Sequence, residues 1–350
     1  MKKRETWLDG LRVLAAFLVI VNHTNSDVFQ ALTPANGTWW LSIVWYALCK
    51  IAVPLFVMIS GAVLLGREDS YRKCLARFGR IVAALLGFSY LYFVHDAWVN
   101  YGLWPRIFQL DVFLRKVWTL EIADSFWYLY FYAGLMLALP LLQRLASAMS
   151  DRDAWYLIGL SIGLGAGWPF LAHFAPVLAL PKYFELPGFT TMIGLFFAGW
   201  QLRKRSKPLH TMPWLIGLAF SVTLSALLLH AQFTQTNGAG KYWAFMDDRM
   251  QPSLLVVIGA ISAFLLARCL FDRSLSERTQ RAWIELGGCS FGIYLLQQWV
   301  IAQTESRLFL PLCNAITAFP AVVVWEIAVF VLCLIAAMIL RRIPVIKKIV

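Results

Sequence analysis

Apolar residues fall into long runs along the whole chain, and the short segments between the runs hold most of the charges. Most runs have about 18 or more residues, the helix length that crosses the hydrocarbon core of a bilayer. We therefore expect an all-α, polytopic membrane protein, in which the sixth span is the shortest. The ten expected spans are residues 8–30, 41–66, 77–99, 125–147, 154–172, 188–203, 212–231, 252–271, 286–308 and 318–341.

The lysines and arginines divide unevenly between the two sides of this predicted bundle. If the N-terminus is cytoplasmic, 22 of the 31 fall in cytoplasmic segments and seven in outer segments. Cytoplasmic loops of membrane proteins carry such an excess of positive charge. The bias predicts that both termini are cytoplasmic, which requires an even number of spans.

The composition narrows the class of protein. Hydrophobic residues make up 60% of the chain and charged residues only 14%, whereas about a quarter of a soluble domain is charged. The net charge is +12, but the cations gather at helix ends and form no basic stripe with exposed aromatics, so we expect no nucleic-acid binding. No repeat or separate soluble domain is evident, and residues 1–350 are expected to form one integral membrane domain.

The cysteines and the N-terminus indicate which covalent and metal features the protein is expected to lack. The six cysteines lie mostly in or beside apolar runs and show no CxxC or Cys/His spacing, so we expect no disulfide and no metal site. The chain begins with the basic sequence MKKR, but no small-residue cleavage site follows the first run. That run is therefore expected to remain as an uncleaved span.

Two residues that are costly in a membrane, Arg12 and His23, lie inside the first apolar run. Their spacing corresponds to about three helical turns and a rise of about 16 Å, so both side chains lie on one stripe of the helix. Ionisable residues at such depth normally face a bundle interior or a water-filled cavity. Alternatively, the arginine snorkels to the surface and the histidine bonds to a neighbouring helix, but their shared face favours joint use.

The ten-residue gap between Arg12 and His23 resembles the Arg-X10-His motif of the bacterial acyltransferase-3 family. Further stretches resemble motifs of that family in the same order, so the resemblance covers nearly the whole chain. They are VPLFVMISGAVL (Val53–Leu64), RFGRI (Arg77–Ile81), SFWYLYFYAGLMLALPLL (Ser125–Leu142) and SFGIYLLQQ (Ser290–Gln298). The chain most resembles the stand-alone members of that family, such as those that acetylate enterobacterial common antigen, so no esterase-like domain is expected after the tenth span.

The resemblance implies a multi-pass enzyme of the bacterial inner membrane. Such an enzyme moves an acyl group, usually acetyl, from cytoplasmic acyl-CoA to a hydroxyl of a cell-surface glycan or its lipid-linked precursor. Acetyl-CoA is then a co-substrate, and no permanently bound cofactor is expected. The chain has Ser125 and Gln297 where the family often has histidine, so His23 is the histidine with a motif match. We expect it to act with Arg12 in catalysis, as general base or as acyl carrier.

The phosphates of CoA require cations on the cytoplasmic side. Topology offers Arg72, Lys73, Arg77 and Arg80. Arg77 and Arg80 also carry a family motif, whereas topological charge explains Arg72 and Lys73 equally well.

On the outer side, Trp127 and Tyr128 are expected to form either an interfacial belt or a stacking wall for a sugar or pantetheine. Asp124 and Glu185 could polarise the catalytic histidine or bind acceptor hydroxyls, although solvated carboxylates are the simpler interpretation. Tyr294 lies within a span, so its hydroxyl needs a partner.

Three further residues are assigned lesser roles. Ser60 is expected to serve in structure or hydrogen bonding, because no GxSxG elbow surrounds it. Gly61 is expected to allow close helix packing. His95, next to Asp96 near the outer end of the third span, is an accessory candidate.

Two other functions fit a bundle with polar residues in its spans. A transporter of a glycan or small solute predicts an internal repeat, but the helix with Arg12 and His23 has no counterpart in the second half of the chain. A non-catalytic scaffold of an envelope complex predicts that replacing His23 leaves function intact. The enzyme hypothesis predicts the opposite.

Overall fold

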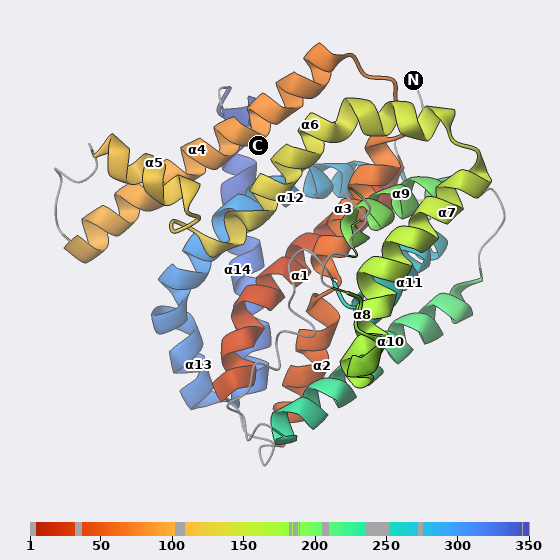
Figure 1. The fold of residues 1–350 in the computed structure, drawn as a ribbon. Coiled ribbons are helices and arrows are strands. Elements are labelled where there is room, and N and C mark those ends of the chain that lie inside the picture. The colour runs from red at the N-terminus through yellow and green to blue at the C-terminus, as the bar shows by residue number, and fades with distance from the viewer. Residues whose placement is uncertain are drawn as a thin grey trace.

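The computed structural model describes residues 5–31, 37–101, 109–181, 184, 188, 190–204, 210–235, 252–271, 276–344 and 346–349. All regular structure in these residues is helical (Figure 1), which confirms the all-α prediction. The α-helices are α1 (Thr6–Ala31), α2 (Trp39–Cys49), α3 (Ala52–Leu64), α4 (Tyr71–Tyr101), α5 (Leu110–Trp118), α6 (Trp127–Ala148), α7 (Asp151–Ile162), α8 (Trp168–Phe174), α9 (Thr191–Arg203), α10 (Thr211–Gln235), α11 (Leu254–Phe271), α12 (Glu277–Thr304), α13 (Leu310–Ala315) and α14 (Ala318–Leu340).

Seven helical stretches of the described residues are long and apolar enough, by length and composition, to cross a membrane. The other three predicted spans correspond to α9, α11 and α12. Helix α9 has only 13 residues and almost all of them are buried, so other helices enclose it. Helix α12 is long, but its first turns are polar. The protein is thus a polytopic helical membrane protein.

Several predicted spans are interrupted rather than continuous. The span predicted at 41–66 consists of α2 and α3, with a break at Lys50 and Ile51. Pro54 explains the break, because proline has no amide hydrogen and its ring clashes with the carbonyl four residues earlier. A π-helical turn at Gly163–Gly167 likewise separates α7 from α8, and another at Glu305–Phe309 separates α12 from α13.

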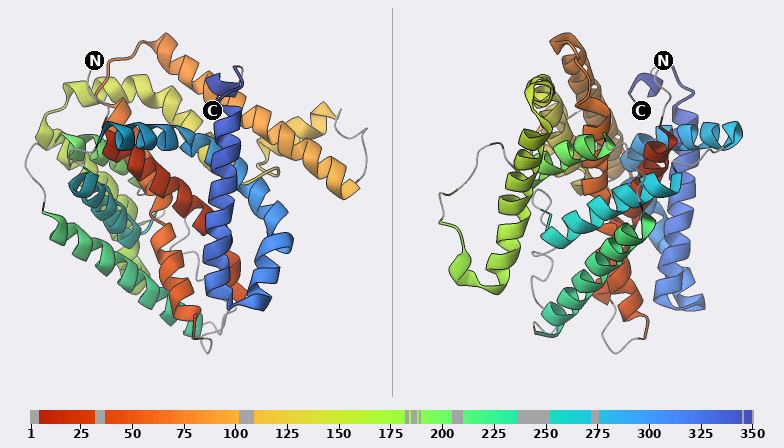
Figure 2. Two further views of the ribbon diagram at one scale, coloured as in Figure 1. Left: turned by 180° about the vertical axis from the view of Figure 1, so that it is seen from behind. Right: turned by 90° about the vertical axis from the view of Figure 1, so that its right-hand side faces the viewer.

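Helix α1 lies at the centre of the bundle. It contacts α2, α3, α11, α12 and α14 (Figure 1). Its packing on α12 is close, since a Cβ at Gly287 would lie 2.7 Å from Cβ of Asp9. Both chain ends lie toward the same end of the bundle (Figures 1 and 2), as the predicted topology requires.

Helices α3 and α9 cross at two glycines. A Cβ at Gly61 would lie 1.7 Å from the carbonyl oxygen of Phe196, and a Cβ at Gly199 would lie 1.9 Å from that of Met58. Because Cβ atoms do not occur at such distances, only glycine permits this crossing at either position. The expectation that Gly61 allows close packing is confirmed.

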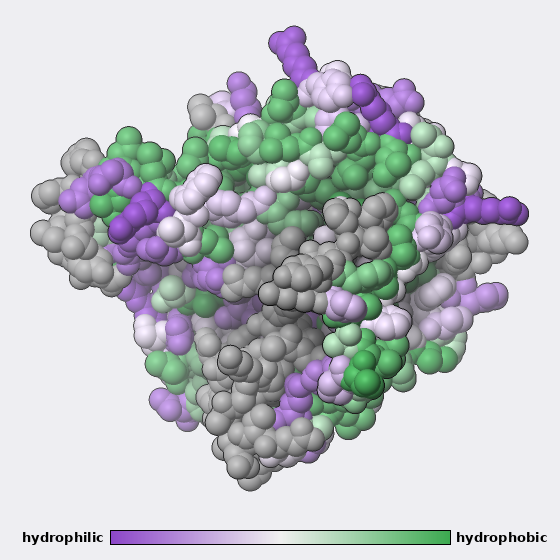
Figure 3. All heavy atoms as spheres, viewed as in Figure 1, coloured by the Kyte–Doolittle hydropathy of each residue, from purple (hydrophilic) through white to green (hydrophobic). Residues whose placement is uncertain are grey.

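The outer surface of the bundle is apolar in the way that a lipid-facing surface requires. Helix α14 exposes Val324, Ile327, Val331 and Ile335. In Figure 3, hydrophobic side chains cover much of the visible helical surface and hydrophilic ones gather toward its margins. Such an exposed apolar area is unusual for a monomeric soluble protein and is expected in a bilayer.

Candidate functional site

The stripe of α1 that carries Arg12 and His23 reaches two different cavities. His23 lines a cavity of about 200 Å³, which we call the histidine cavity. Arg12 lines a second cavity of about 540 Å³, which we call the arginine cavity because Arg67, Arg77 and Arg80 also line it. Both residues lie on the single helix α1, as predicted, but they line separate chambers.

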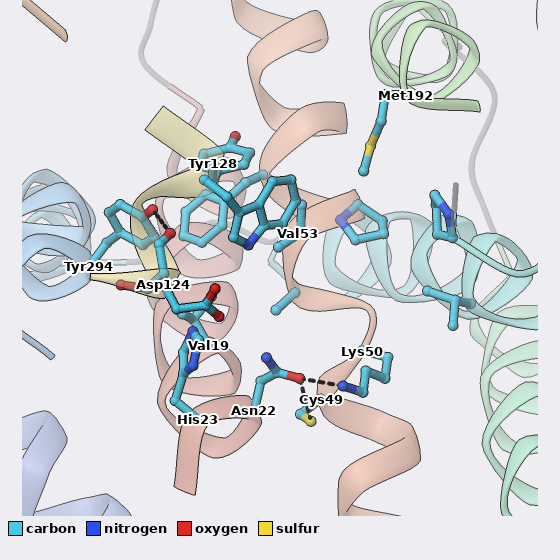
Figure 4. A pocket seen from close by; sticks show the side chains of 17 residues that line it. Val19, Asn22, His23, Cys49, Lys50, Val53, Asp124, Tyr128, Met192 and Tyr294 are labelled. Carbon is cyan, nitrogen blue, oxygen red and sulfur yellow. Dashed lines mark hydrogen bonds between the residues drawn. The ribbon is translucent and has the colours of Figure 1, made fainter. Parts of the chain in front are cut away.

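The histidine cavity brings an imidazole and a carboxylate together. Asp124 begins the short 3₁₀ turn that leads into α6. Its carboxylate points toward the ring of His23, as Figure 4 shows. A carboxylate in this position can fix the orientation of an imidazole and stabilise its protonated form.

The break between α2 and α3 places an ammonium group in the same cavity. Lys50 donates a hydrogen bond of 2.8 Å to Oδ1 of Asn22, which also accepts from Sγ of Cys49 at 3.7 Å (Figure 4). The ammonium lies 4.0 Å from the centre of the Tyr46 ring. Sequence reasoning missed Lys50 and Asn22. The available signal was a lysine inside an apolar run and an amide next to His23.

Carboxylates hold two of the four arginines in the arginine cavity. Arg12 donates to the buried Asp9 at 2.6 Å, and Arg77 donates to Asp69 at 2.6 Å. No ion pair joins Arg67 or Arg80 to a described residue. Guanidinium groups suit phosphate groups in charge and geometry, so this chamber fits a phosphorylated ligand.

Asp69 anchors the N-terminal end of α4. It accepts from Lys73 at 2.5 Å and from Arg77, and Gln143 also bonds to it at 3.2 Å. Burial by itself would raise the pKa of the Asp69 carboxyl, but these hydrogen bonds and the charge of Arg77 hold it well below its ordinary value. Asp69 and Gln143 were not identified from the sequence, because their contact joins loop and helix positions far apart in the chain.

Three aromatic side chains line both cavities: Phe56, Tyr128 and Tyr294. The ring centre of Tyr128 lies 6.3 Å from that of Phe56 and 5.9 Å from that of Tyr294. The Tyr294 hydroxyl donates to the carbonyl of Ser125, which gives it the partner predicted from its burial. We call these three residues the aromatic wall, because they form the boundary that the two chambers share.

The remaining predicted site residues are placed as follows. Trp127 lines the histidine cavity only, and Ser60 lines the arginine cavity, 3.5 Å from the Tyr132 hydroxyl. Arg72 and Lys73 are not among the residues that line the arginine cavity. Glu185 lies outside the described residues.

The two positions where the family often has histidine differ in their surroundings. Ser125 lines the histidine cavity and donates to Oε1 of Gln298 at 2.8 Å. Gln297 is fully buried, and its amide atoms make no hydrogen bond with any described residue. Neither side chain can act as an acid–base imidazole, as the sequence indicates.

A buried carboxyl group that contacts Thr24, the residue after His23 in the sequence, was also missed. Glu326 of α14 is fully buried and accepts hydrogen bonds from Oγ1 of Thr24 at 2.8 Å and from Nε1 of Trp45 at 2.9 Å. Its signal in the sequence was a single carboxylate in the apolar run 318–341. It ties α14 to α1 directly after His23.

The fold is thus a polytopic helical membrane bundle with two internal cavities, one lined by a histidine and a carboxylate and the other by four arginines. The family model described as an acyltransferase domain matches residues 5–342, and the chain belongs to this acyltransferase-3 family. The protein is therefore a membrane acyltransferase. No curated protein and no solved structure matches the chain.

Proposed function

We propose that the protein is an O-acyltransferase of the bacterial inner membrane. It moves an acetyl or other short acyl group from cytoplasmic acyl-CoA to a hydroxyl of an envelope polysaccharide or its lipid-linked precursor. The observation that carries this proposal is the aromatic wall, which separates a chamber suited to the donor from a chamber suited to proton transfer.

The arginine cavity is the proposed donor site. The phosphates of CoA would bind Arg67 and Arg80, with Arg12 and Arg77 held nearby by their carboxylates. The pantetheine arm would reach the aromatic wall, and the thioester would pass between Phe56, Tyr128 and Tyr294 toward His23. Acetyl-CoA serves as a co-substrate.

In direct transfer, His23 removes the proton of the acceptor hydroxyl. The hydroxyl oxygen attacks the thioester carbonyl carbon, an ester bond forms and the carbon–sulfur bond breaks. CoA leaves as the thiolate, which takes up the proton that His23 received. Asp124 would stabilise the imidazolium between these steps.

In the two-step route, a ring nitrogen of His23 attacks the thioester carbon, the carbon–sulfur bond breaks and CoA leaves as the thiolate. The thiolate takes up the N–H proton that the acylated imidazole loses. The acceptor hydroxyl then attacks the acyl carbon of the acyl-imidazole. The ester bond forms, the carbon–nitrogen bond breaks, and the hydroxyl proton passes to the released imidazole. Lys50 is placed to bind oxygen atoms of the acceptor or of the acyl group in either route.

The transporter alternative has less support, because the chain belongs to an acyltransferase family. A glycan-modifying function also agrees with a histidine cavity on the side predicted to face outward. The direct experiment is to purify the protein in nanodiscs with labelled acetyl-CoA and to measure CoA release and label on envelope glycan.

His23→Ala should abolish transfer, whereas His173→Ala, a matched change outside both cavities, should leave it intact. Unimpaired transfer by the His23 variant, or a failure of the wild type to bind acetyl-CoA, would overturn the proposal. Label bound covalently to His23 would select the two-step route.

A further inference from the structure

A third cavity, of about 650 Å³, lies between α4, α5 and α12, and we call it the α4–α12 cleft. Its polar and aromatic lining includes His95, Asp96, Lys116, Gln298, Trp299 and Gln303. Its residues come from the end of α4, from the adjoining α5 and from the last turns of α12, which the predicted topology places on the outer side. The proposed function does not use this cavity.

A tyrosine hydroxyl fixes the wall of the cleft. Tyr92 of α4 donates to the carbonyl of Leu295 at 3.0 Å and accepts from the backbone N–H of Trp299 at 2.9 Å. In a regular α-helix, the N–H of Trp299 would donate directly to the carbonyl of Leu295, four residues earlier. Here the Tyr92 hydroxyl is inserted between these two groups. Trp299 is 40% exposed, and its ring packs edge-on against His95 with centres 5.5 Å apart. An aromatic surface is thus held in place at the cleft.

The cleft adjoins the histidine cavity through one pair of side chains. Gln298 lines the cleft, and its Oε1 accepts from both Oγ and N of Ser125, at 2.8 and 3.3 Å. Ser125 lines the histidine cavity. The two cavities therefore adjoin at this pair, and the cleft is placed beside the chamber that holds His23.

The charges of the cleft differ from those of the arginine cavity. The cleft is lined by one cation, Lys116, and by two carboxylates, Asp96 and Glu121. The amides of Gln298 and Gln303 add neutral hydrogen-bond donors and acceptors. A lining of mixed charge, amides and an aromatic face suits a neutral, hydroxyl-rich ligand better than a polyanion. The rings of sugars offer an apolar face and several hydroxyls, which match these two kinds of group.

We propose that the α4–α12 cleft is a subsite for a neutral sugar unit of the acceptor, next to the unit that is acylated in the histidine cavity. The inference rests on the proposed function, because it assumes a glycan acceptor. It adds a binding surface, formed mainly by Trp299 and Gln303, that extends acceptor recognition beyond the reacting sugar.

The test measures glycan binding by saturation-transfer NMR with the full chain in nanodiscs. The probes are glucose and N-acetylglucosamine, their linear tetrasaccharides and a tetra-hexuronate of matched length. We expect a neutral tetrasaccharide to bind at least fivefold more tightly than its monosaccharide. Trp299→Ala and Gln303→Ala should remove that gain, and Trp299→Phe should restore part of it.

Trp118→Ala is the matched control, since Trp118 of α5 is 88% exposed and does not line the cleft. In this variant, the gain in affinity from monosaccharide to tetrasaccharide should stay within twofold of the wild-type value. The proposal is overturned if no neutral tetrasaccharide binds, if only the hexuronate binds, or if Trp299→Ala and Gln303→Ala leave the gain unchanged. Acetyl-CoA titration of the same samples separates the two proposals, because loss of the donor site would refute the proposed function and a subsite failure would leave donor binding intact.

Discussion

The arginine cavity and the histidine cavity share an aromatic wall but differ in size and charge. The first has about 540 Å³ and four guanidinium groups, and the second has about 200 Å³ and a histidine, a carboxylate and a lysine. A neutral imidazole becomes positively charged when it accepts a proton. Four arginines beside it would oppose that change, whereas a carboxylate favours it. In the proposed function, this difference keeps donor binding and proton transfer in separate chambers.

The glycine crossing of α3 and α9 is the place where both chambers should fail together, because α3 lines both. Gly61→Ala inserts a methyl group 1.7 Å from the Phe196 carbonyl oxygen. We expect a loss of stability of about 1–3 kcal/mol or more from overpacking. Thermal unfolding in detergent and acetyl-CoA binding should both show it. Gly79→Ala is the control, because a Cβ at Gly79 would have no neighbouring atom within 4 Å. Equal stability of the two variants would refute the close packing of α3 on α9.

Asp124→Asn should affect the histidine cavity alone. The amide cannot stabilise a protonated His23, so we expect acyl transfer to fall by about a hundredfold or more. The affinity for acetyl-CoA should stay within about twofold, because the arginine cavity is unchanged. Steady-state transfer rates and isothermal titration measure the two quantities. If the variant lost affinity for acetyl-CoA instead, this would contradict the assignment of donor binding to the arginine cavity and proton transfer to the histidine cavity.

Arg80→Ala should produce the opposite pattern. Loss of one charge-assisted contact to phosphate costs about 1.5–3 kcal/mol, so the Kd for acetyl-CoA should rise about 10- to 100-fold. The rate at saturating donor should change little, and the loss should shrink at high salt. Arg72→Ala is the matched control, since Arg72 does not line the cavity. The same loss in both variants would indicate a general charge effect.

Asp69 offers a smaller and pH-dependent test of the arginine cavity. Its pKa is lowered in the folded protein, so its contribution to stability is present above its ordinary pKa near 4 and is lost as the pH falls below that value. Asp69→Asn should weaken acetyl-CoA binding about three- to tenfold at pH 7, because Arg77 loses its anchor.

The stability of the wild type should fall between pH 5 and pH 3 more steeply than that of Asp69→Asn. Thermal unfolding over this range measures the difference. Parallel curves for the two proteins would show that Asp69 does not contribute in this way.

The sequence predicted the helical class, most of the spans and the common stripe of Arg12 and His23. These features follow from hydropathy and helical geometry, which depend only on residues close together in the chain. It also indicated Arg77, Arg80, Asp124 and Tyr128, which the structure places on the two cavities. Their assigned functions remain predictions.

The rest depended on contacts between distant segments. Phe56 belongs to the aromatic wall only because α3, α6 and α12 meet there, and Gln143 reaches Asp69 across 74 positions of the chain. Lys50 and Glu326 could have been noticed, since an ionisable residue inside an apolar run is costly without a partner. Their partners, Asn22 and Thr24, became evident only from the fold.

The central claim is that the acyl group passes from the arginine cavity to the histidine cavity, and therefore across the membrane. Inside-out membrane vesicles from expressing cells expose the cytoplasmic face to added, impermeant labelled acetyl-CoA and enclose the outer-face glycan. We expect label on the enclosed glycan in these vesicles, none in right-side-out vesicles, and none with His23→Ala. Equal labelling of both vesicle types, or label on glycan in the same compartment as the donor, would contradict the account.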